Sequence, residues 1–570
     1  MPFEMDRQFY ARLYGPTVGD RVRLGDTNLL ATVERDDTAY GEELLWGFGK
    51  TLRDSMQMTS HDDRDSTLDL IIGGALILDP VLGIFKGNIG IKDGRIVAIG
   101  RAGNPDIADD VELVSGSNTG WIMAEGMVAT PGVVDSHVHL ATTSLIPAAL
   151  SAGTTTIVGM GYGHVSDLGV NPAYNFHRLL EAWEGFPLNV ALLGRGSASG
   201  RGALERNLEM GSAGLKIHED TAGYPSVIDN ALTVAEEYDV PVCIHTDSHQ
   251  EAGELEETLD AIGGRTIHAY HIEGTGGGHP NVLELVSQPH ILGSSTTPTI
   301  PYTVNTLAEY PDMKMVVHRM HGFLDEDRES VRWRARGGTV AAETVLHDMG
   351  AIGIVSSDSQ GMGRIGEVVT RTWQMAHRMK EVSLQTAPGG AGEADGPTDN
   401  ERILRYLAKI TINPAIAQGL AHEVGSLEPG KLADVVLWRP EFFGAKPQLV
   451  LKGGFVAWSP VGSGNDSTRL GQPQIYRPMF GSHGTAPASL GVAFVSQAAI
   501  DNGLATRVAL RRRLSPVTRA RPLTKADFIR NDASPTVRVD PQTLDVEIDG
   551  HPVDLPPAET LPLTQRYFLV

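Results

Sequence analysis

The sequence predicts an α/β fold with a (β/α)8 barrel at its centre, because strand-like and helix-like segments alternate through the middle of the chain. Eight short runs rich in Val, Ile, Leu and Thr occur there, and most are separated by stretches of helical composition such as NFHRLLEAW and SVIDNALTVAEEY. Such alternation is typical of parallel strands covered by helices, and eight repeats close into a barrel. The expected strands are residues 133–139, 154–160, 189–194, 214–218, 241–246, 266–272, 290–296 and 352–358.

The segments that flank the barrel predict a second, β-rich domain. Residues 66–130 contain short strand signals with Gly-Asn, Asp-Gly and Glu-Gly pairs, which favour tight turns, and residues 426–458 contain further strand signals. We therefore expect one β-sandwich-like domain built from both flanks, with the barrel inserted between them. The expected boundaries are 1–130 and 423–480 for the two parts of the β domain, 131–422 for the barrel, and 481–570 for a C-terminal mixed segment.

Length and composition indicate a large enzyme outside the membrane. The chain has 570 residues, which exceeds one hydrophobic core, and its net charge of −23 argues against binding to nucleic acid or to an anionic membrane. No apolar run is long enough to span a bilayer, and MPFEMDRQFY does not resemble a signal peptide, so we expect a cytoplasmic protein. The single cysteine, Cys243, excludes an internal disulfide framework and a metal site built from thiolates.

Polar side chains that could bind metal stand at the ends of five of the expected strands. The carboxyl ends of all barrel strands meet at one rim, so these side chains are expected to lie close together. Two histidines in a His-x-His pair on a strand point to the same face. Nitrogen and oxygen donors suit Zn, Ni, Fe or Mn, and the sequence does not choose among them. The candidate ligands are His137, His139, Lys216, His245, His271 and Asp358.

Lys216 is the unusual member of this set. An ammonium group beside divalent metal ions would be repelled, so the lysine must be deprotonated, placed elsewhere or converted into an anion. Carbamylation by CO2 produces such an anion, a carboxylate that can bridge two metal ions. The alternative is an ordinary lysine that forms a salt bridge with Glu219 or Asp220.

Longer motifs resemble the urease alpha (catalytic) subunit. The resemblance covers essentially the whole chain, and motifs of this length are far more specific than a His-x-His pair. The motifs are YGPTVGDRVRLGDT (14–27), GLKIHED (214–220), IHTD (244–247), HAYHIEGTGGGH (268–279), PYTVNTLAEY (301–310), SSDSQGMGRIGEV (356–368), TINPAIAQGLAHEVGSLEPGK (411–431) and LPLTQRYFLV (561–570).

The resemblance implies a barrel of the amidohydrolase type and a hydrolase acting on linear amide C–N bonds, which converts urea to ammonia and carbamate. It implies two Ni²⁺ ions bridged by Lys216 after carbamylation with CO2. One ion would also be held by His245 and His271. The other would be held by His137, His139 and Asp358.

The resemblance also implies roles for residues around the metal ions. Metal-activated water would attack the urea carbon, while His218 would hydrogen-bond the urea oxygen. His318, on a mobile flap, would protonate the departing ammonia as a general acid. Asp220 and Arg334 would orient His318.

The chain departs from the family pattern in the wall of the site. Since the ligands remain while the wall changes, the substrate and the rate stay open. Two alternatives are an amidohydrolase derived from urease that acts on another small urea-like or cyclic amide, and a catalytically weak paralogue that serves assembly or metal storage. The departures are Gly163-His164-Val165 in place of Gly-Pro-Ala, Thr221-Ala222 in place of Trp-Gly, His249 and Gln250 in place of Leu and Asn, Val317 in place of Cys, Arg319 in place of His, and Gly361 in place of Ala.

The resemblance further implies partners. Urease alpha chains of this kind assemble with smaller beta and gamma subunits, usually as a trimer of heterotrimers, and they need nickel-delivery accessory proteins. No segment similar to the small subunits is fused to this chain, so separate polypeptides are expected. The ligand would be urea or a similar small amide, in urea degradation and nitrogen metabolism.

Overall fold

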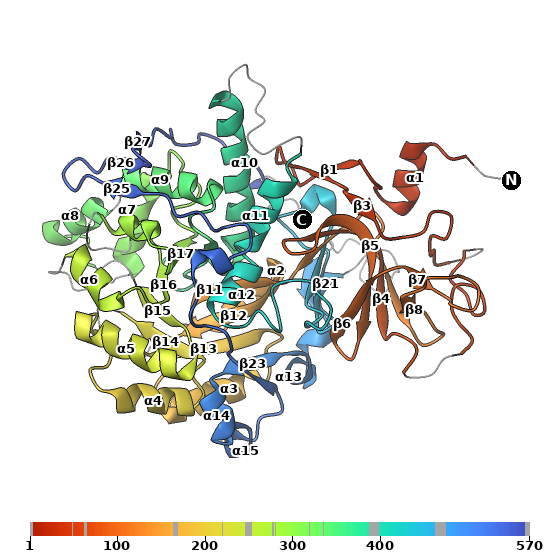
Figure 1. The fold of residues 1–570 in the computed structure, drawn as a ribbon, viewed down its shortest axis with the longest axis horizontal. Coiled ribbons are helices and arrows are strands. Elements are labelled where there is room, and N and C mark those ends of the chain that lie inside the picture. Colours follow the sequence, from red (N-terminus) through yellow and green to blue (C-terminus); the bar gives the residue numbers. More distant parts are fainter. Residues whose placement is uncertain are drawn as a thin grey trace.

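The structure is a computed structural model, and the ribbon in Figure 1 shows a barrel region beside a β-rich region. It describes residues 4–47, 50–61, 65–163, 169–218, 221–245, 254–275, 279, 281–317, 320–334, 336–386, 398–461 and 475–564.

Within the described residues, eight parallel strands form the barrel and follow one another in chain order. A parallel bridge between Val138 and Ser359 joins the first strand to the segment that follows the last one, and the His139 N–H donates to the Ser359 carbonyl at 2.9 Å. This closure confirms the predicted (β/α)8 barrel. The strands are β11 (Val133–His139), β12 (Thr154–Met160), β13 (Asn189–Arg195), β14 (Gly214–Ile217), β15 (Val242–His245), β16 (Ile267–Tyr270), β17 (Ile291–Thr296) and β18 (Ile354–Ser356).

Helices surround these strands because each has an apolar face that must be covered. Helix α5 (Pro225–Tyr238) shows the pattern: Pro225 occupies the first turn, and buried residues recur at helical spacing, as in Ile228, Leu232 and Ala235. Its last turn ends at Asp239 in the left-handed conformation. The other helices around the strands include α2 (Leu145–Ser151), α3 (Ala173–Trp183), α4 (Arg201–Glu209), α6 (Leu255–Ile262), α9 (Gly337–Asp348), α10 (Val368–Thr386), α11 (Asn400–Ala408) and α12 (Ile412–Ala417).

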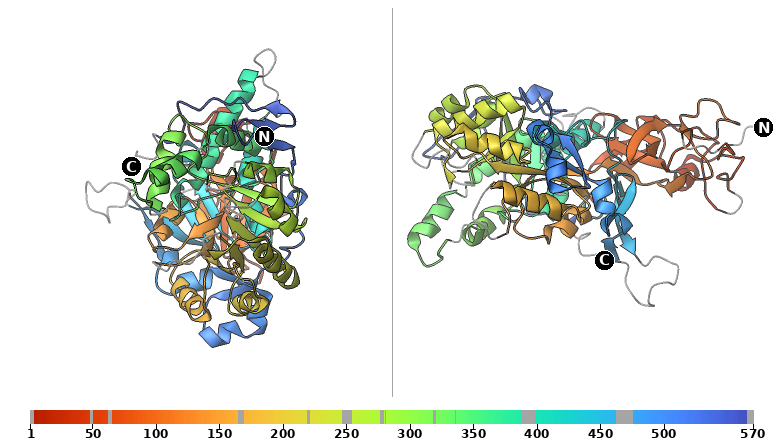
Figure 2. Two further views of the ribbon diagram at one scale, coloured as in Figure 1. Left: turned by 90° about the vertical axis from the view of Figure 1, so that its left-hand side faces the viewer. Right: turned by 90° about the horizontal axis from the view of Figure 1, so that it is seen from below.

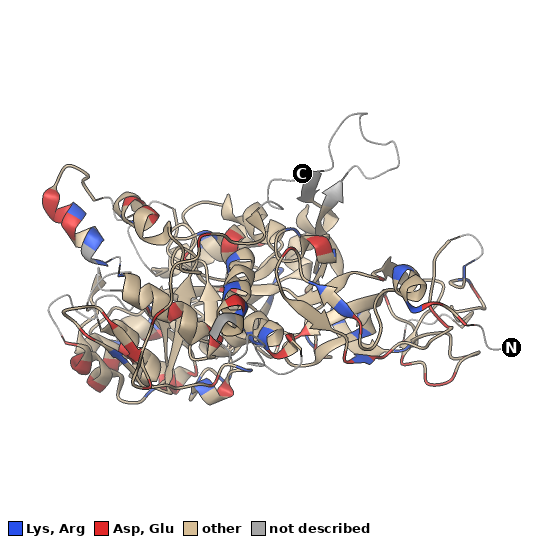
Figure 3. Cartoon of the chain, turned by 90° about the horizontal axis from the view of Figure 1, so that it is seen from above, with Lys and Arg blue, Asp and Glu red and all other residues tan. Residues whose placement is uncertain are grey.

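Helices α7 (Thr306–Val317) and α8 (Asp325–Arg334) project from the barrel (Figure 2). Helix α8 begins with three acidic residues and has Arg332 and Arg334 in its last turn, so its charges complement the helix dipole (Figure 3). No helix in the described part of the chain is long and apolar enough to cross a membrane.

Both flanks of the barrel contribute to one sheet, as the fold prediction required. Strand β10 (Val128–Pro131), which directly precedes the barrel, pairs antiparallel with β19 (Val435–Trp438), which follows it. In the described residues this sheet has the order β22-β21-β20-β19-β10-β4-β5-β3, with β6 beside β5 and β9 beside β4. The remaining strands are β3 (Arg35–Asp36), β4 (Leu70–Asp79), β5 (Gly83–Lys92), β6 (Arg95–Gly100), β9 (Gly120–Met123), β20 (Leu449–Lys452), β21 (Phe455–Val461) and β22 (Ile475–Pro478).

The turn between β5 and β6 is a two-residue hairpin loop made by Asp93 and Gly94. Both residues have positive φ, 47° and 77°, as a type I′ turn requires. The Asp-Gly pair in the sequence therefore predicted a real hairpin.

The C-terminal segment has a role that its composition did not indicate. Strand β23 (Val492–Val495) pairs parallel with barrel strand β13, and β24 (Arg513–Pro516) pairs with β23. The segment thus extends the barrel sheet on the outside, at β13.

Candidate metal centre

Three candidate ligands meet where the first and last barrel strands close the barrel. The His137 and His139 Nε2 atoms lie 3.3 and 3.2 Å from Asp358 Oδ1. Side chains at alternate positions of β11 share a face, so both imidazoles point the same way. Asp358 follows β18 with a φ of 53°, a left-handed conformation that directs its carboxylate toward them. One donor atom from each of the three residues lies within 4.8 Å of the others.

A buried carboxylate ties the two strands that carry these ligands. The backbone N–H groups of His137 and Ser357 donate to Asp135 Oδ1 at 3.2 and 3.0 Å, and the Ser357 hydroxyl donates to the His137 carbonyl at 3.2 Å. Burial raises the pKa of Asp135 to about 6, although these hydrogen bonds oppose the rise. Sequence reasoning missed Asp135, yet its position two residues before His137 on the same strand face was a usable signal.

The other candidate ligands form an adjoining group at the ends of β14, β15 and β16. The His245 and His271 rings meet edge to face with centroids 4.2 Å apart, and the His218 ring stacks on His245 at 3.9 Å. His271 also adjoins the first group, since its ring centroid is 5.6 Å from that of His137. Its φ of 32° is unusual for a residue other than glycine and turns the chain sharply after β16. All the histidine candidates among the ligands therefore form one contiguous cluster.

Lys216 reaches the same cluster from β14. Its side chain is buried, and its Nζ lies 3.9 Å from the centre of the Tyr270 ring, which itself stacks on His137 at 3.8 Å. The alternative partners Glu219 and Asp220 lie outside the described residues.

Burial keeps the histidines in the form that binds metal. Desolvation, together with neighbouring positive groups, holds the pKa of His137 and of His245 well below the ordinary value, so both imidazoles are neutral at physiological pH. Burial alone would raise the pKa of Asp358, but contact with His139 and nearby positive charges lower it overall, so this carboxylate is ionised. A neutral imidazole and an ionised carboxylate are the ligating species.

The donor set fits divalent metal ions. The Nδ1 atom of His137 is buried and has no hydrogen-bond partner among the described residues, which is costly unless a ligand satisfies it. Imidazole nitrogens with carboxylate oxygens suit Zn, Ni, Fe and Mn.

Of the residues predicted to transfer a proton or to orient the proton donor, only Arg334 lies within the described residues. His318, Asp220 and Arg319 lie outside the described residues, as do His164, Val165, His249 and Gln250. Val317 is the last residue of α7, and Arg334 is the last residue of α8. Burial lowers the pKa of Arg336 to about 10, and the positive charge of the nearby Arg334 adds to this effect.

Helix α7, which leads to His318, is anchored beside the metal-ligand cluster. The Lys314 ammonium donates to the Thr275 carbonyl at 3.1 Å, and the Tyr310 hydroxyl donates to the same oxygen. Thr275 follows the candidate ligand His271 by four residues. Helix α7 therefore contacts the loop that follows this candidate ligand.

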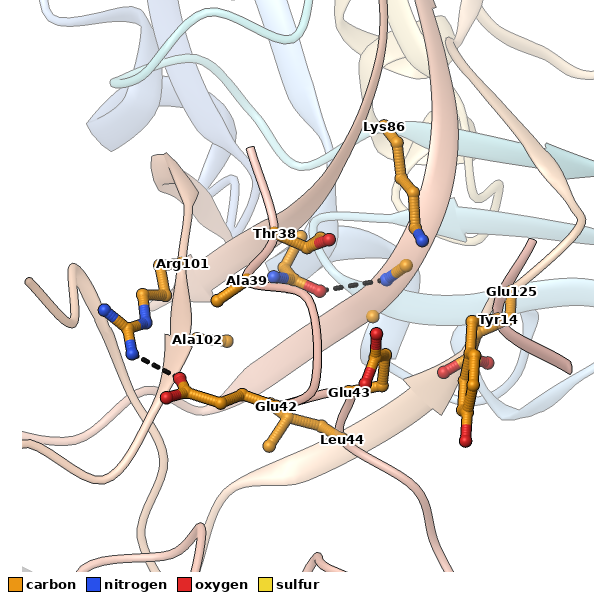
Figure 4. Close-up of a pocket in the computed structure, with 13 residues that line it drawn as sticks. Tyr14, Thr38, Ala39, Glu42, Glu43, Leu44, Lys86, Arg101, Ala102 and Glu125 are labelled. Atoms are coloured by element: carbon orange, nitrogen blue, oxygen red, sulfur yellow. Dashed lines mark hydrogen bonds and ion pairs between the residues drawn. The ribbon is translucent and has the colours of Figure 1, made fainter. Parts of the chain in front are cut away.

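A separate pocket in the β domain does not share this chemistry (Figure 4). Three of its charged groups have partners nearby: Arg101 pairs with Glu42, and the Lys86 Nζ lies 3.7 Å from Asp36 Oδ2 and 3.3 Å from the Tyr10 hydroxyl. These contacts account for much of the polar lining as part of the fold.

Thiol reagents are expected to react slowly with this chain. Cys243 is fully buried in β15, burial raises the pKa of its thiol, and Gln418 Nε2 lies 3.3 Å from its sulfur. A buried thiol with a raised pKa reacts slowly. Maleimide or iodoacetamide at neutral pH should therefore leave turnover unchanged, whereas a hydroxamate, which binds metal, should abolish it.

The matched control is Val317→Cys, which places a thiol at the end of α7, where the family that the chain resembles has a cysteine. This variant should lose activity with maleimide while the unmodified protein does not. Rapid inactivation of the unmodified protein would contradict the prediction.

Ala222→Gly is expected to stabilise the chain. Ala222 has a φ of 104°, a conformation that side chains rarely adopt, and the family that the chain resembles has glycine there. Relief of this strain should add about 1 kcal/mol to the free energy of unfolding, and the melting temperature should rise accordingly. The control is Ala198→Gly, at a position without positive φ, which should lower stability by about 0.4–1 kcal/mol. Equal shifts in the two variants would show that Ala222 is not strained.

Known proteins resemble the chain along its whole length. The family model "Urease alpha-subunit, N-terminal domain" matches residues 3–122, and the model "Amidohydrolase family" matches residues 128–472. The urease subunit alpha of Haloquadratum walsbyi is 48% identical over 576 aligned positions, which cover 100% of both chains. Among solved structures, a D-hydantoinase is 17% identical with a TM-score of 0.44 and covers 68% of this chain and 95% of its own. The dihydropyrimidinase from Brevibacillus agri is 15% identical with a TM-score of 0.47 and covers 68% of this chain and 94% of its own.

Proposed function

This chain belongs to the urease alpha-subunit family, and we propose that it is the catalytic subunit of an enzyme that hydrolyses urea to ammonia and carbamate. One observation carries the proposal. The imidazoles of His137, His139, His245 and His271, with the Asp358 carboxylate and Lys216, converge at the carboxyl rim of the barrel from five different strands. Active sites of (β/α)8 enzymes are built at that rim.

We propose that this cluster holds two Ni²⁺ ions. Lys216, carbamylated by CO2, would be a ligand of both, His245 and His271 would complete the set for one, and the group of His137, His139 and Asp358 would complete the set for the other. When bound, the ions polarise the substrate carbonyl and make water nucleophilic at neutral pH.

His218 is proposed to bind the urea oxygen through its imidazole N–H. Its ring is supported on one face by His245, at 3.9 Å between centroids. Its backbone is fixed by Ser197, since the Ser197 hydroxyl donates to the His218 carbonyl and the His218 N–H donates to the Ser197 oxygen, each at 3.2 Å. The Thr221 N–H and hydroxyl also donate to that carbonyl, both at 3.1 Å. A substrate-binding group held in this way keeps its orientation when the substrate is absent.

His318 is proposed to deliver a proton from its imidazole to the departing nitrogen, with Asp220 and Arg334 orienting it. The position of His318 directly after α7 supports this role, because Lys314 and Tyr310 anchor that helix to Thr275, close to the ligand His271. A helix that moves as a unit from such an anchor could bring an acid to the substrate and exclude water.

The proposed partners follow from the same family. We propose that the chain assembles with separate beta and gamma subunits as a trimer of heterotrimers, and that nickel-delivery accessory proteins load the metal site. Co-purification with tagged small subunits would test the assembly.

A second candidate is hydrolysis of another small urea-like or cyclic amide. The observation behind it is Gly361, which stands where the family has alanine and lies against two proposed ligands: a Cβ built on it would be 2.3 Å from Asp358 Oδ1 and 2.9 Å from His139 Cδ2. The wall beside the proposed ligands is therefore packed differently from that of the family.

Metal analysis combined with a substrate comparison tests both candidates. The protein should be produced with its small subunits and nickel-delivery accessory proteins, and ammonia release should be measured with urea, substituted ureas and hydantoin. Two nickel ions per chain and the highest kcat/KM with urea are expected. A preference for a substituted urea or hydantoin would favour the second candidate, and bound nickel without any turnover would contradict both.

A further inference from the structure

We propose that Tyr270 is a positioning residue whose ring holds His137 and Lys216 in the arrangement that binds metal. The inference rests on the proposed function, because it assigns metal binding to those two side chains. Tyr270 is not itself placed to coordinate an ion, and its contribution would act through its two neighbours.

The Tyr270 ring contacts candidate ligands from two other strands. It stacks on the His137 imidazole with centroids 3.8 Å apart and planes inclined by 13°, and the Lys216 Nζ lies 3.9 Å from its centroid. Tyr270 ends β16, whereas His137 lies on β11 and Lys216 on β14. One ring therefore sets the relative position of side chains from three strands.

The ring is fixed at both ends. Its backbone belongs to β16, and its hydroxyl donates to the Ser136 carbonyl on β11 at 2.8 Å. These two strands are the sixth and the first in the barrel order and are not neighbours, so the side chain spans the barrel interior. Ser136 directly precedes His137, which places the anchor beside the ligand that the ring supports.

The residues beneath the ring are themselves held in place. The His268 ring meets the Tyr270 ring edge to face with centroids 4.7 Å apart, and the Gln418 side-chain amide nitrogen lies 2.8 Å from His268 Nδ1. Tyr270 and His268 are both fully or almost fully buried. The aromatic floor of the metal site thus has little freedom to shift.

Such support matters most for Lys216. A lysine side chain has many rotamers, and a ligand that bridges two ions must keep a single one. The ring limits where the Lys216 side chain can lie and also fixes the plane of the His137 imidazole. Partners of this kind, which orient metal ligands without binding the metal, typically change metal affinity by about 10–100-fold when they are removed.

The experiment compares Tyr270→Phe, which keeps the ring, with Tyr270→Met, which fills a similar volume without a ring. Metal-free full-length protein is titrated with Co²⁺ in the presence of bicarbonate and a competing chelator. The affinity, the stoichiometry and the visible absorption spectrum of bound Co²⁺ are measured, because the spectrum reports the geometry of the ligands. The thermal stability of each metal-free variant is recorded alongside.

Tyr270→Met is expected to bind Co²⁺ about 10–100-fold more weakly and to show an altered spectrum. Tyr270→Phe should restore affinity and spectrum to nearly those of the unmodified protein. If Tyr270→Met does not fold, Tyr270→Leu takes its place. The matched control is Tyr406→Met. Tyr406 is another fully buried tyrosine, and its hydroxyl donates to Asp348 Oδ1 at 3.1 Å, outside the candidate metal site. This variant should lose stability and keep its Co²⁺ affinity.

Two results would overturn the inference: unchanged Co²⁺ affinity and spectrum without the ring, or a loss in Tyr270→Phe as large as in Tyr270→Met. The proposed function fails in a different way. Unmodified protein that binds Co²⁺ and yet shows no hydrolysis of urea when loaded with Ni²⁺ would refute the substrate, while the comparison of the Tyr270 variants would still decide the role of the ring.

Discussion

Lys216→Ala is expected to lose both metal ions and all measurable turnover while the barrel stays folded. Lys216 is proposed to be a ligand of both ions, so its removal should weaken the binding of both. Removal of a ligand of only one ion should weaken the binding of that ion alone. The fold should survive because Lys216 lies at the end of β14, next to the rim, and the strand keeps its pairing with β13 and β15. Metal content by elemental analysis, ammonia release and far-UV circular dichroism are the three measurements.

The control for Lys216→Ala is Lys409→Met, which removes another fully buried lysine. The Lys409 ammonium donates to the Ile352 carbonyl at 2.6 Å and also contacts the Asn531 side chain. This variant should lose stability but retain its metal ions. Full metal occupancy in Lys216→Ala would refute the assignment of Lys216 as a ligand and would favour an ordinary salt bridge.

His318→Ala is expected to keep both metal ions and to lower kcat by roughly 10²–10⁴-fold, the usual contribution of a positioned general acid. Its side chain is proposed to give up a proton and not to bind metal, so metal content should not change. The effect should fall on kcat, because the proton is transferred during the chemical step and not when urea binds. Steady-state kinetics with urea, at matched nickel content, would measure it.

His218→Ala provides the contrast for His318→Ala. His218 is proposed to bind the substrate oxygen, so its removal should raise KM clearly. The two variants should therefore differ in which kinetic constant changes most. Normal turnover in His318→Ala would show that the proton comes from another group.

The sequence indicated the fold because the relevant signals are local. Buried parallel strands appear as short apolar runs, and each of the eight runs corresponds to a barrel strand, within a few residues at the ends. The Asp93-Gly94 turn was predictable for the same reason, since its geometry depends on two adjacent residues. The pairing of β23 with β13 was not predictable, because residues that pair across roughly 300 positions leave no periodic signal in either segment.

The candidate site likewise combines features that the sequence predicted with features that only the structure revealed. The alternation of side chains along a strand, together with the common rim of a barrel, was enough to select the six candidate ligands, and the structure brings them into one cluster. The supporting contacts were not visible in this way. Ser197 holds His218 but stands in no metal-ligand pattern. Asp135 accepts hydrogen bonds from both sides of the barrel closure, and only its position two residues before His137 pointed to it.

The sequence by itself determined the strands, the barrel, the candidate ligands and the family to which they belong, because each of these depends on residue type and spacing along the chain. The tertiary structure alone decided how the barrel closes, how Tyr270 crosses its interior to contact His137 and Lys216, and which histidines are neutral. The physical reason is that these properties arise from burial and from contacts between strands that are far apart in sequence. Desolvation and packing are properties of the folded interior, so they exist only once the strands have come together.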